Sequence, residues 1–105
     1  MNSPPYRYLT VDGELGGTGL RDSLEGKELS PSDIGCSNAL SRKFENWLRR
    51  YELEHYNEFR NVKTLEKLDQ EGISICKSLM ADLPAIKVTY YSHGLAKALW
   101  FKNPT

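Results

Sequence analysis

Apolar residues recur every three or four positions in two long segments of the chain, which is the spacing of one face of an α-helix. The first segment starts after Ser37, whose side chain is suited to cap a helix N-terminus, and breaks off at 57–61. The second starts at Val62 or Thr64 and continues to Leu83. The predicted core-facing residues are Leu40, Phe44, Trp47, Leu48, Tyr51 and His55, followed by Leu65, Leu68, Gly72, Ile75, Cys76, Leu79 and Leu83.

Two residues of the second segment carry further information. Pro84 ends the predicted helix, because proline lacks an N–H and disfavours the helical conformation in the residue before it. Gly72 lies inside the helix, where glycine costs roughly 1 kcal/mol relative to alanine. That cost is explained if another backbone packs closely there, so we expect a strand or helix to cross over Gly72.

Two other segments have the composition of β-strands. Residues 6–11 are rich in aromatic and β-branched side chains and end at the turn dipeptide Asp12-Gly13. Residues 86–91 alternate with period two, which places Ile86, Val88 and Tyr90 on one face and Lys87, Thr89 and Tyr91 on the other. Residues 94–101 fit either a short helix or an edge strand.

The order of these elements predicts an α/β (α+β) fold, a two-layer sandwich of two long helices packed on a small β-sheet. Residues 1–105 form a single α/β domain, since a chain of this length has room for one core. A Gly-rich connecting region at 13–35 contains at most short strands, around 18–22 and 27–29. If the first and last clear strands pair, the open face of the sheet carries some of Tyr6, Tyr8, Lys87, Thr89 and Tyr91.

The composition is that of a soluble globule, with 39% hydrophobic and 27% charged residues. The 14 basic and 14 acidic side chains cancel, which argues against the basic surface that holds small proteins on nucleic acid. Cys36 and Cys76 form neither a disulfide framework nor a metal-binding pair. No secretory signal and no apolar stretch of about 20 residues stands out, so we expect a cytoplasmic protein.

No motif in the chain predicts a catalytic residue, a metal ligand or a cofactor. His55 and His93 belong to no metal-ligand spacing. A phosphate-binding loop leads directly into a helix, but the glycines at 13–19 are not followed by apolar residues at helical spacing. They therefore do not fit such a loop. One alternative stays open: an RNase-like arrangement of His55, His93 and a basic residue.

Residues 51–59 pack three acids and three aromatics into one short stretch, which is typical of a protein-binding surface. The alternative is that Tyr51 and Phe59 belong to the core and that the acids only solubilise the helix. The residues predicted to bind a partner are Glu52, Glu54, His55, Tyr56, Glu58 and Tyr91.

Several segments together resemble a known group of proteins. They are Gly-Thr-Gly-Leu-Arg-Asp at 17–22, Leu-Ser-Pro-Ser-Asp-Ile-Gly at 29–35, Trp-Leu-Arg-Arg-Tyr-Glu at 47–52, Leu-Asp-Gln-Glu-Gly-Ile at 68–73 and the strand at 87–91. Over about residues 6–93 the chain is similar to small bacterial α/β proteins encoded beside polymorphic toxins. Some of those are immunity proteins of contact-dependent growth inhibition systems.

The resemblance implies a cytosolic protein that binds the C-terminal domain of a cognate toxin, often a nuclease, and blocks it. Such a protein needs no catalytic residues, no cofactor and no direct contact with nucleic acid or membrane. Inhibitors of nucleases are commonly acidic, whereas this chain has no net charge, so any acidic patch must be local. The alternatives are a small RNA-acting enzyme and a housekeeping protein-interaction module.

Overall fold

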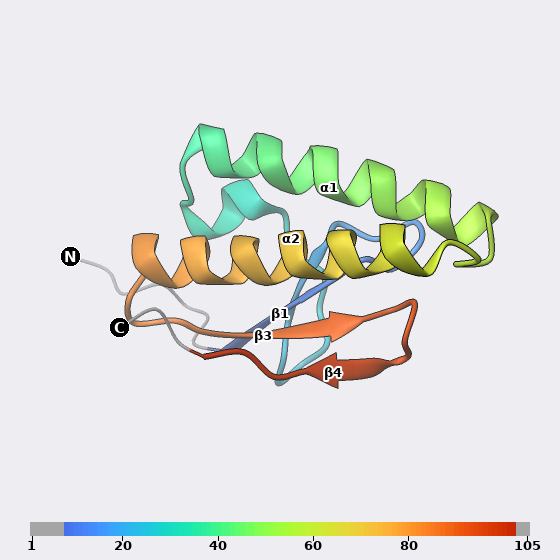
Figure 1. The fold of residues 1–105 in the computed structure, drawn as a ribbon. Helices are drawn as coiled ribbons and strands as arrows, with labels where there is room; N and C mark the ends of the chain where they lie inside the picture. Colours follow the sequence, from blue (N-terminus) through green and yellow to red (C-terminus); the bar gives the residue numbers. More distant parts are fainter. Residues whose placement is uncertain (1–7, 103–105) are drawn as a thin grey trace.

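Two long helices lie on one face of a four-stranded sheet (Figure 1). The computed structural model describes residues 8–102. The elements follow in the order β1 (Tyr8–Asp12), β2 (Leu20–Asp22), a short 3-10 helix (Pro31–Ile34), α1 (Asn38–Tyr56), α2 (Val62–Asp82), β3 (Lys87–Ser92) and β4 (Lys97–Leu99). This arrangement confirms the predicted α+β fold, with two helices packed on a small sheet.

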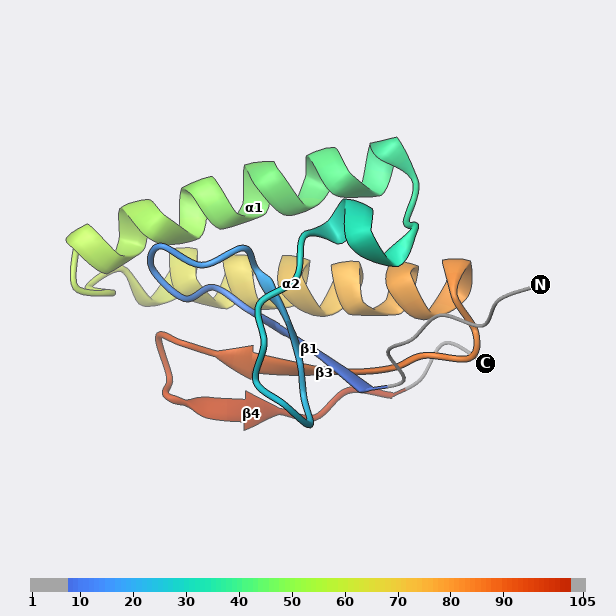
Figure 2. The same cartoon turned by 180° about the vertical axis from the view of Figure 1, so that it is seen from behind.

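The sheet is mixed and has the strand order β2-β1-β3-β4. β1 and β3 run parallel at its centre, with Leu9 beside Val88 and Asp12 beside Tyr91, and the edge strands pair antiparallel. Parallel strands need a long crossover connection, which here contains both helices. The carboxyl ends of β1 and β3 therefore lie at the same end of the molecule, on the right in Figure 1 and on the left in Figure 2.

Polar side chains cap the N-termini of both long helices. Ser37 Oγ accepts a hydrogen bond from the backbone N–H of Leu40 (3.1 Å), as predicted, and Asn61 Oδ1 accepts one from Thr64 (3.0 Å). α2 ends at Asp82, just before Leu83 and Pro84. Both helices thus begin and end close to the positions that the sequence predicts.

The apolar stripes of the two helices form most of the core. Trp47 and Tyr51 are fully buried, and Trp47 Nε1 donates a hydrogen bond to the carbonyl oxygen of Leu68 (2.8 Å), which ties α1 to α2. Leu48, His55 and Leu83, also assigned to the stripes, are only half-buried. The buried helical residues are Leu40, Phe44, Trp47 and Tyr51 in α1 and Leu65, Leu68, Asp69, Gly72, Ile75, Cys76 and Leu79 in α2.

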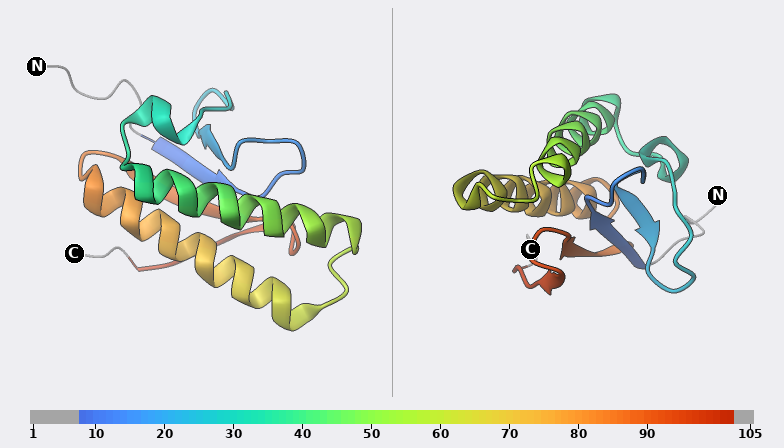
Figure 3. Two further views of the ribbon diagram at one scale, coloured as in Figure 1. Left: turned by 90° about the horizontal axis from the view of Figure 1, so that it is seen from above. Right: turned by 90° about the vertical axis from the view of Figure 1, so that its right-hand side faces the viewer.

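No helix of the described residues covers the other face of the sheet, as the end-on view in Figure 3 shows. Tyr8, Lys87 and Thr89 are exposed and Tyr91 is half-buried, in agreement with the predicted open face, whereas Tyr6 lies outside the described residues. The alternate residues of β3 face the helices. These are Val88 and Tyr90, which are buried together with the preceding Ile86.

The short elements differ partly from expectation. Of the two strands expected in the connecting region, residues 18–22 contain β2, but residues 27–29 contribute only an isolated bridge between Glu28 and Arg21. The segment 94–101, which fits a helix or a strand by sequence, contains β4 and completes the sheet. In the described part of the chain, no helix combines the length and apolar character needed to cross a membrane.

A close neighbour from a strand is present at Gly72, as predicted, but it is a side chain and not the backbone that we expected. The ring of Tyr90 from β3 lies directly over this glycine, so that a Cβ at position 72 would stand 2.3 Å from Tyr90 Cε1. Real Cβ atoms do not approach a ring carbon so closely. The glycine therefore allows α2 to lie close against β3.

Gly72→Ala is expected to lower the free energy of unfolding by about 1–3 kcal/mol, because the added methyl group overlaps the Tyr90 ring. Urea denaturation measures this change. Ser74→Ala, at an exposed position of the same helix, is the matched control and should shift stability by no more than about 0.5 kcal/mol. A Gly72→Ala protein as stable as the wild type would show that the contact does not constrain the packing.

Candidate functional site

Three connections meet where β1 and β3 end: the β1–β2 loop (13–19), the α1–α2 loop (57–61) and the β3–β4 turn (93–96) (Figures 1 and 2). We call these three segments, together with the adjoining helical residues 52–56 and 62–65, the loop end. Side chains join them: His55 Nε2 lies 2.7 Å from the carbonyl oxygen of Gly13, and Phe59 and Leu65 pack against Gly94. The loop end is therefore one continuous surface built from segments far apart in the sequence.

A buried carboxylate supports the loop end from inside. Asp69 of α2 is 4% exposed, and its Oδ1 accepts hydrogen bonds from the hydroxyls of Tyr51 (2.9 Å) and Tyr90 (2.6 Å). Its Oδ2 accepts one from Ser92 Oγ (2.7 Å). Burial is the largest cause of the raised pKa of both tyrosines, so both phenols stay protonated and donate to Asp69.

The same network holds the turn that carries His93. The backbone N–H of Gly94 donates to Tyr51 Oη (3.2 Å), and that of Leu95 donates to Ser92 Oγ (3.1 Å). Each hydroxyl thus accepts from the turn and donates inward to the carboxylate. The position of His93 is set by these bonds on its C-terminal side and by β3 on its N-terminal side.

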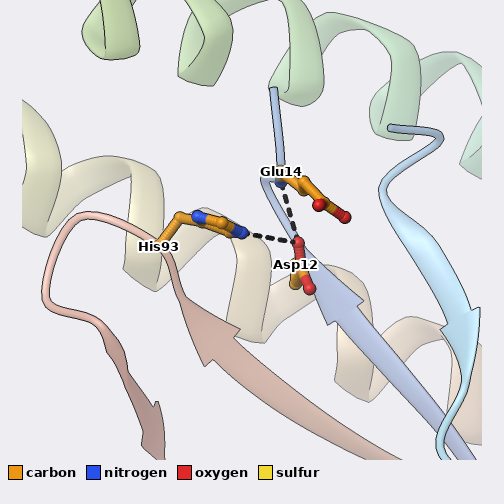
Figure 4. A group of neighbouring side chains, drawn as sticks. All are labelled: Asp12, Glu14 and His93. Atoms are coloured by element: carbon orange, nitrogen blue, oxygen red, sulfur yellow. Dashed lines mark hydrogen bonds and ion pairs between the residues drawn. The ribbon is translucent and has the colours of Figure 1, made fainter. Parts of the chain in front are cut away.

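Asp12, at the end of β1, joins three segments on the open side of the sheet (Figure 4). It is 4% exposed, and its Oδ1 accepts a hydrogen bond from the backbone N–H of Glu14 (2.8 Å) and lies 3.5 Å from His93 Nε2. Its Oδ2 makes no regular hydrogen bond, and the Arg21 guanidinium of β2 supplies the counter-charge to this oxygen. Asp12 is thus a charged residue with its partners already in place.

The two histidines lie side by side, with ring centroids 5.4 Å apart. Phe59 packs against His55 (4.8 Å) and Tyr91 against His93 (5.5 Å). Burial lowers the pKa of His93, and the neighbouring His55 lowers it further, while Glu14 acts in the opposite direction. His93 is therefore neutral at pH 7, so its contact with Asp12 is not an ion pair there.

This histidine cluster, made of Asp12, Glu14, Arg21, His55 and His93, has two kinds of chemistry available to it. Adjacent imidazoles beside a carboxylate can transfer protons near neutral pH. Asp12, Glu14 and His93 also offer one ligand atom each within 4.8 Å of one another, a donor set that fits a divalent cation. Arg21 already neutralises Asp12, so a metal ion would compete with a guanidinium for this carboxylate.

The sequence alone does not indicate that Asp12, Glu14 or Arg21 belong to a site. Their proximity to His93 depends on the parallel pairing of β1 with β3, which places Asp12 opposite Tyr91. The periodicity of a strand indicates its faces but not its neighbours. The only available signal was that Asp12 and His93 each follow closely on the apolar part of a predicted strand.

The predicted partner-binding residues occupy several sides of the loop end. Tyr56 is 77% exposed and Glu58 is also exposed at the C-terminal end of α1, where Arg60 lies 3.3 Å from the Glu58 carboxylate. Glu52 is directed to the β1–β2 loop, since its Oε2 accepts a hydrogen bond from the N–H of Gly16 (3.3 Å). His55 belongs to the histidine cluster, Glu54 lines a pocket between α1 and α2, and Tyr91 lies on the open face of the sheet.

The stretch 51–59 is therefore divided between core and surface. Tyr51 is fully buried and Phe59 is half-buried, so the alternative reading of these two aromatics was correct for Tyr51 and partly so for Phe59. The exposed apolar residues that replace them at the loop end were not singled out from the sequence. They are Leu15, Leu53, Val62 and Leu95, in addition to Tyr56.

Comparison of the chain with protein families, with curated proteins and with solved structures finds no match.

His93→Gln is expected to flatten the dependence of stability on pH between about pH 5 and pH 7. The folded protein holds the pKa of His93 below its usual value of 6.5, so the unfolded chain binds more protons in this range. Wild-type stability should therefore fall as the pH drops through 6.5 and below. Urea denaturation across this range measures the slope; Lys97→Gln should keep the wild-type slope, and an unchanged slope in His93→Gln would contradict the assignment.

Proposed function

We propose that this protein is an immunity protein that binds a cognate bacterial toxin domain stoichiometrically and neutralises it. The exposed apolar side chains near the end of α1 and the start of α2 carry the proposal. Leu53, Tyr56 and Val62 are 63%, 77% and 64% exposed there. Large apolar side chains that gather on a surface are typical of protein-binding sites, and tyrosine is among the residues that contribute most to binding energy.

The rigidity of the support favours the same function. The helices that carry Leu53, Tyr56 and Val62 are joined by the bond from Trp47 to Leu68 and by the Asp69 network. A surface already held in its binding conformation loses little conformational entropy on association. Tight binding without turnover is the behaviour expected of an inhibitor on such a scaffold.

Local charge agrees with a basic partner. Glu52 and Glu58 lie close in sequence to the exposed Leu53 and Tyr56, although Glu52 is directed to the β1–β2 loop and Arg60 offsets part of the charge of Glu58. Carboxylates around an apolar centre steer a basic partner and fix its orientation. The toxin implied by the resemblance is often a nuclease. The surface with which a nuclease binds nucleic acid is positively charged, as expected of a partner for these carboxylates.

Co-expression tests the proposal. The toxin domain encoded directly upstream of this gene should arrest growth when expressed alone and should be harmless with this protein present. The two chains should co-elute from a sizing column as a stable complex. Neither rescue nor co-elution would refute the proposal, and rescue without a complex would indicate an enzymatic antidote instead.

Charge reversal tests the surface separately. Replacing Glu52, Glu54 and Glu58 by lysine should abolish protection, because like charges then face the basic partner. Reversal of Glu25, Glu45 and Asp82, which are exposed elsewhere, is the matched control and should keep protection. Both variants must unfold at the wild-type temperature. Protection that survives the first reversal would move the interface away from these residues.

A second candidate function is supported by one observation, the adjacency of His55 and His93 beside Asp12. We infer that such a site would cleave RNA by paired acid and base catalysis. Neutral His93 would accept the proton of a ribose 2′-hydroxyl as its oxygen attacks phosphorus. The imidazole of His55, in its protonated form, would give its proton to the departing 5′ oxygen.

Incubation of the purified protein with mixed RNA tests this second function. Cleavage should fall by at least about 100-fold in the His55→Gln/His93→Gln variant, since each catalytic proton transfer contributes about 100-fold or more. An activity that persists in the double variant comes from a contaminant or another site. If the same variant still protects cells from the toxin, the two histidines are not needed for inhibition.

A further inference from the structure

A pocket of about 220 Å³ lies between α1 and α2 on their solvent side, next to the loop end. Leu53 and Leu68 provide its apolar surface, and charged side chains surround it. Its volume is below the roughly 300–1,000 Å³ of pockets that enclose small-molecule ligands and cofactors. Its size suits one side chain of a partner protein.

An ion pair between a residue of α1 and a residue of α2 forms one wall of the pocket. Arg50 donates two hydrogen bonds to the Glu71 carboxylate, of 2.8 and 2.6 Å, in the bidentate geometry that favours this pairing. The charges of these two residues are therefore satisfied by each other. The charged groups left to interact with a ligand are Glu54 and Lys67.

Glu54 differs from the other charged residues of this pocket, because its Oε1 atom is buried and has no hydrogen-bond partner among residues 8–102. A carboxylate oxygen removed from water and given no donor is costly, and native structures hold few such atoms. The missing interaction is a hydrogen bond to this oxygen, and a positively charged donor makes the strongest one to a carboxylate. Lys67 at the rim is exposed, so water screens its charge, and its flexible side chain can move aside.

We propose that this pocket receives one arginine side chain of the toxin domain, with its guanidinium hydrogen-bonded to Glu54 and its methylene groups against Leu53 and Leu68. The proposal rests on the proposed inhibitory function and names the anchor of that interface. Arginine fits better than lysine, because its planar guanidinium is less strongly hydrated and presents several donors to a carboxylate. Its stem buries apolar surface while its charge meets Glu54.

The first test uses the protein alone and N-acetyl-L-arginine amide as the probe. Titration followed by NMR should shift the methyl signals of Leu53 and Leu68 and leave that of Leu24, exposed on the β2 side, unchanged. Glu54→Gln, which keeps the shape of the side chain and removes its charge, should abolish the shifts. Equal shifts in Glu54→Gln, or none in the wild type, would overturn the arginine site.

Lys67→Ala distinguishes a cationic ligand from an anionic or zwitterionic one. Removing this positive charge should strengthen binding of the arginine probe by about 2- to 5-fold, because like charges repel. Lys77→Ala, at an exposed position further along α2, is the matched control and should leave affinity unchanged. Weaker binding by Lys67→Ala would show that the pocket recognises a negative group, which contradicts the proposal.

The second test uses the complex with the toxin domain. Glu54→Gln should weaken binding of the toxin by about 30-fold or more, as expected when one partner of a buried charge pair is removed. Glu66→Gln, exposed on α2, is the matched control and should bind like the wild type. Wild-type affinity in Glu54→Gln would overturn the anchor and leave the inhibitory function standing. A wild-type protein that does not bind the toxin would overturn both.

Discussion

The hydrogen bonding of one buried carboxylate, Asp69, is the constraint on which the rest of the structure depends. A charge removed from water is tolerated only when its oxygens receive hydrogen bonds, and here the donors are Tyr51 of α1 and Tyr90 and Ser92 of β3. These donors come from both neighbours of α2. Moving α2 would take Asp69 away from all three donors, and moving α1 or β3 would remove one or two of them, so the network fixes the relative positions of these elements as well as their association.

This constraint extends to the surface. Two of the hydroxyls that donate to Asp69, those of Tyr51 and Ser92, accept hydrogen bonds from the turn that follows His93, and the ring of Tyr51 lies against Gly13 at the start of the β1–β2 loop. A Cβ on Gly13 would stand 2.5 Å from this ring, so glycine is needed for the contact. Part of the glycine-rich region therefore serves packing against α1. That explains, without any phosphate ligand, why a glycine follows the first strand.

The parts of the fold that could be predicted from the sequence are those in which periodicity alone carries the information. The helix caps, the end of α2 before Pro84, the alternation of β3 and the contact at Gly72 depend on a few neighbouring residues. Asp69 also had a local signal, since it lies four residues after Leu65 on the buried stripe of α2. A carboxylate at a core position indicates a hydrogen-bonded network, but its donors belong to other elements.

The candidate sites could be predicted only in part, because they depend on which strands become neighbours. Exposed Tyr56 and Glu58 follow from their place at the end of a helix. The approach of His93 to Asp12 requires β1 and β3 to be parallel, and strand faces alone do not determine strand order. The same limit applies to Glu54, whose buried oxygen depends on the way α1 and α2 pack together.

The two proposed activities place different demands on this scaffold. The proposed inhibition would use the outside of α1 and α2, where apolar side chains are exposed and Glu54 Oε1 lacks a donor among the described residues. Catalysis would use the other side of α1, where Arg21 already neutralises Asp12. A carboxylate with its counter-charge in place is electrostatically satisfied, whereas an unpaired buried oxygen and exposed tyrosine and leucine side chains gain free energy when a partner covers them. Of the two proposals, inhibition through the helical surface is therefore the one that these unsatisfied interactions support better.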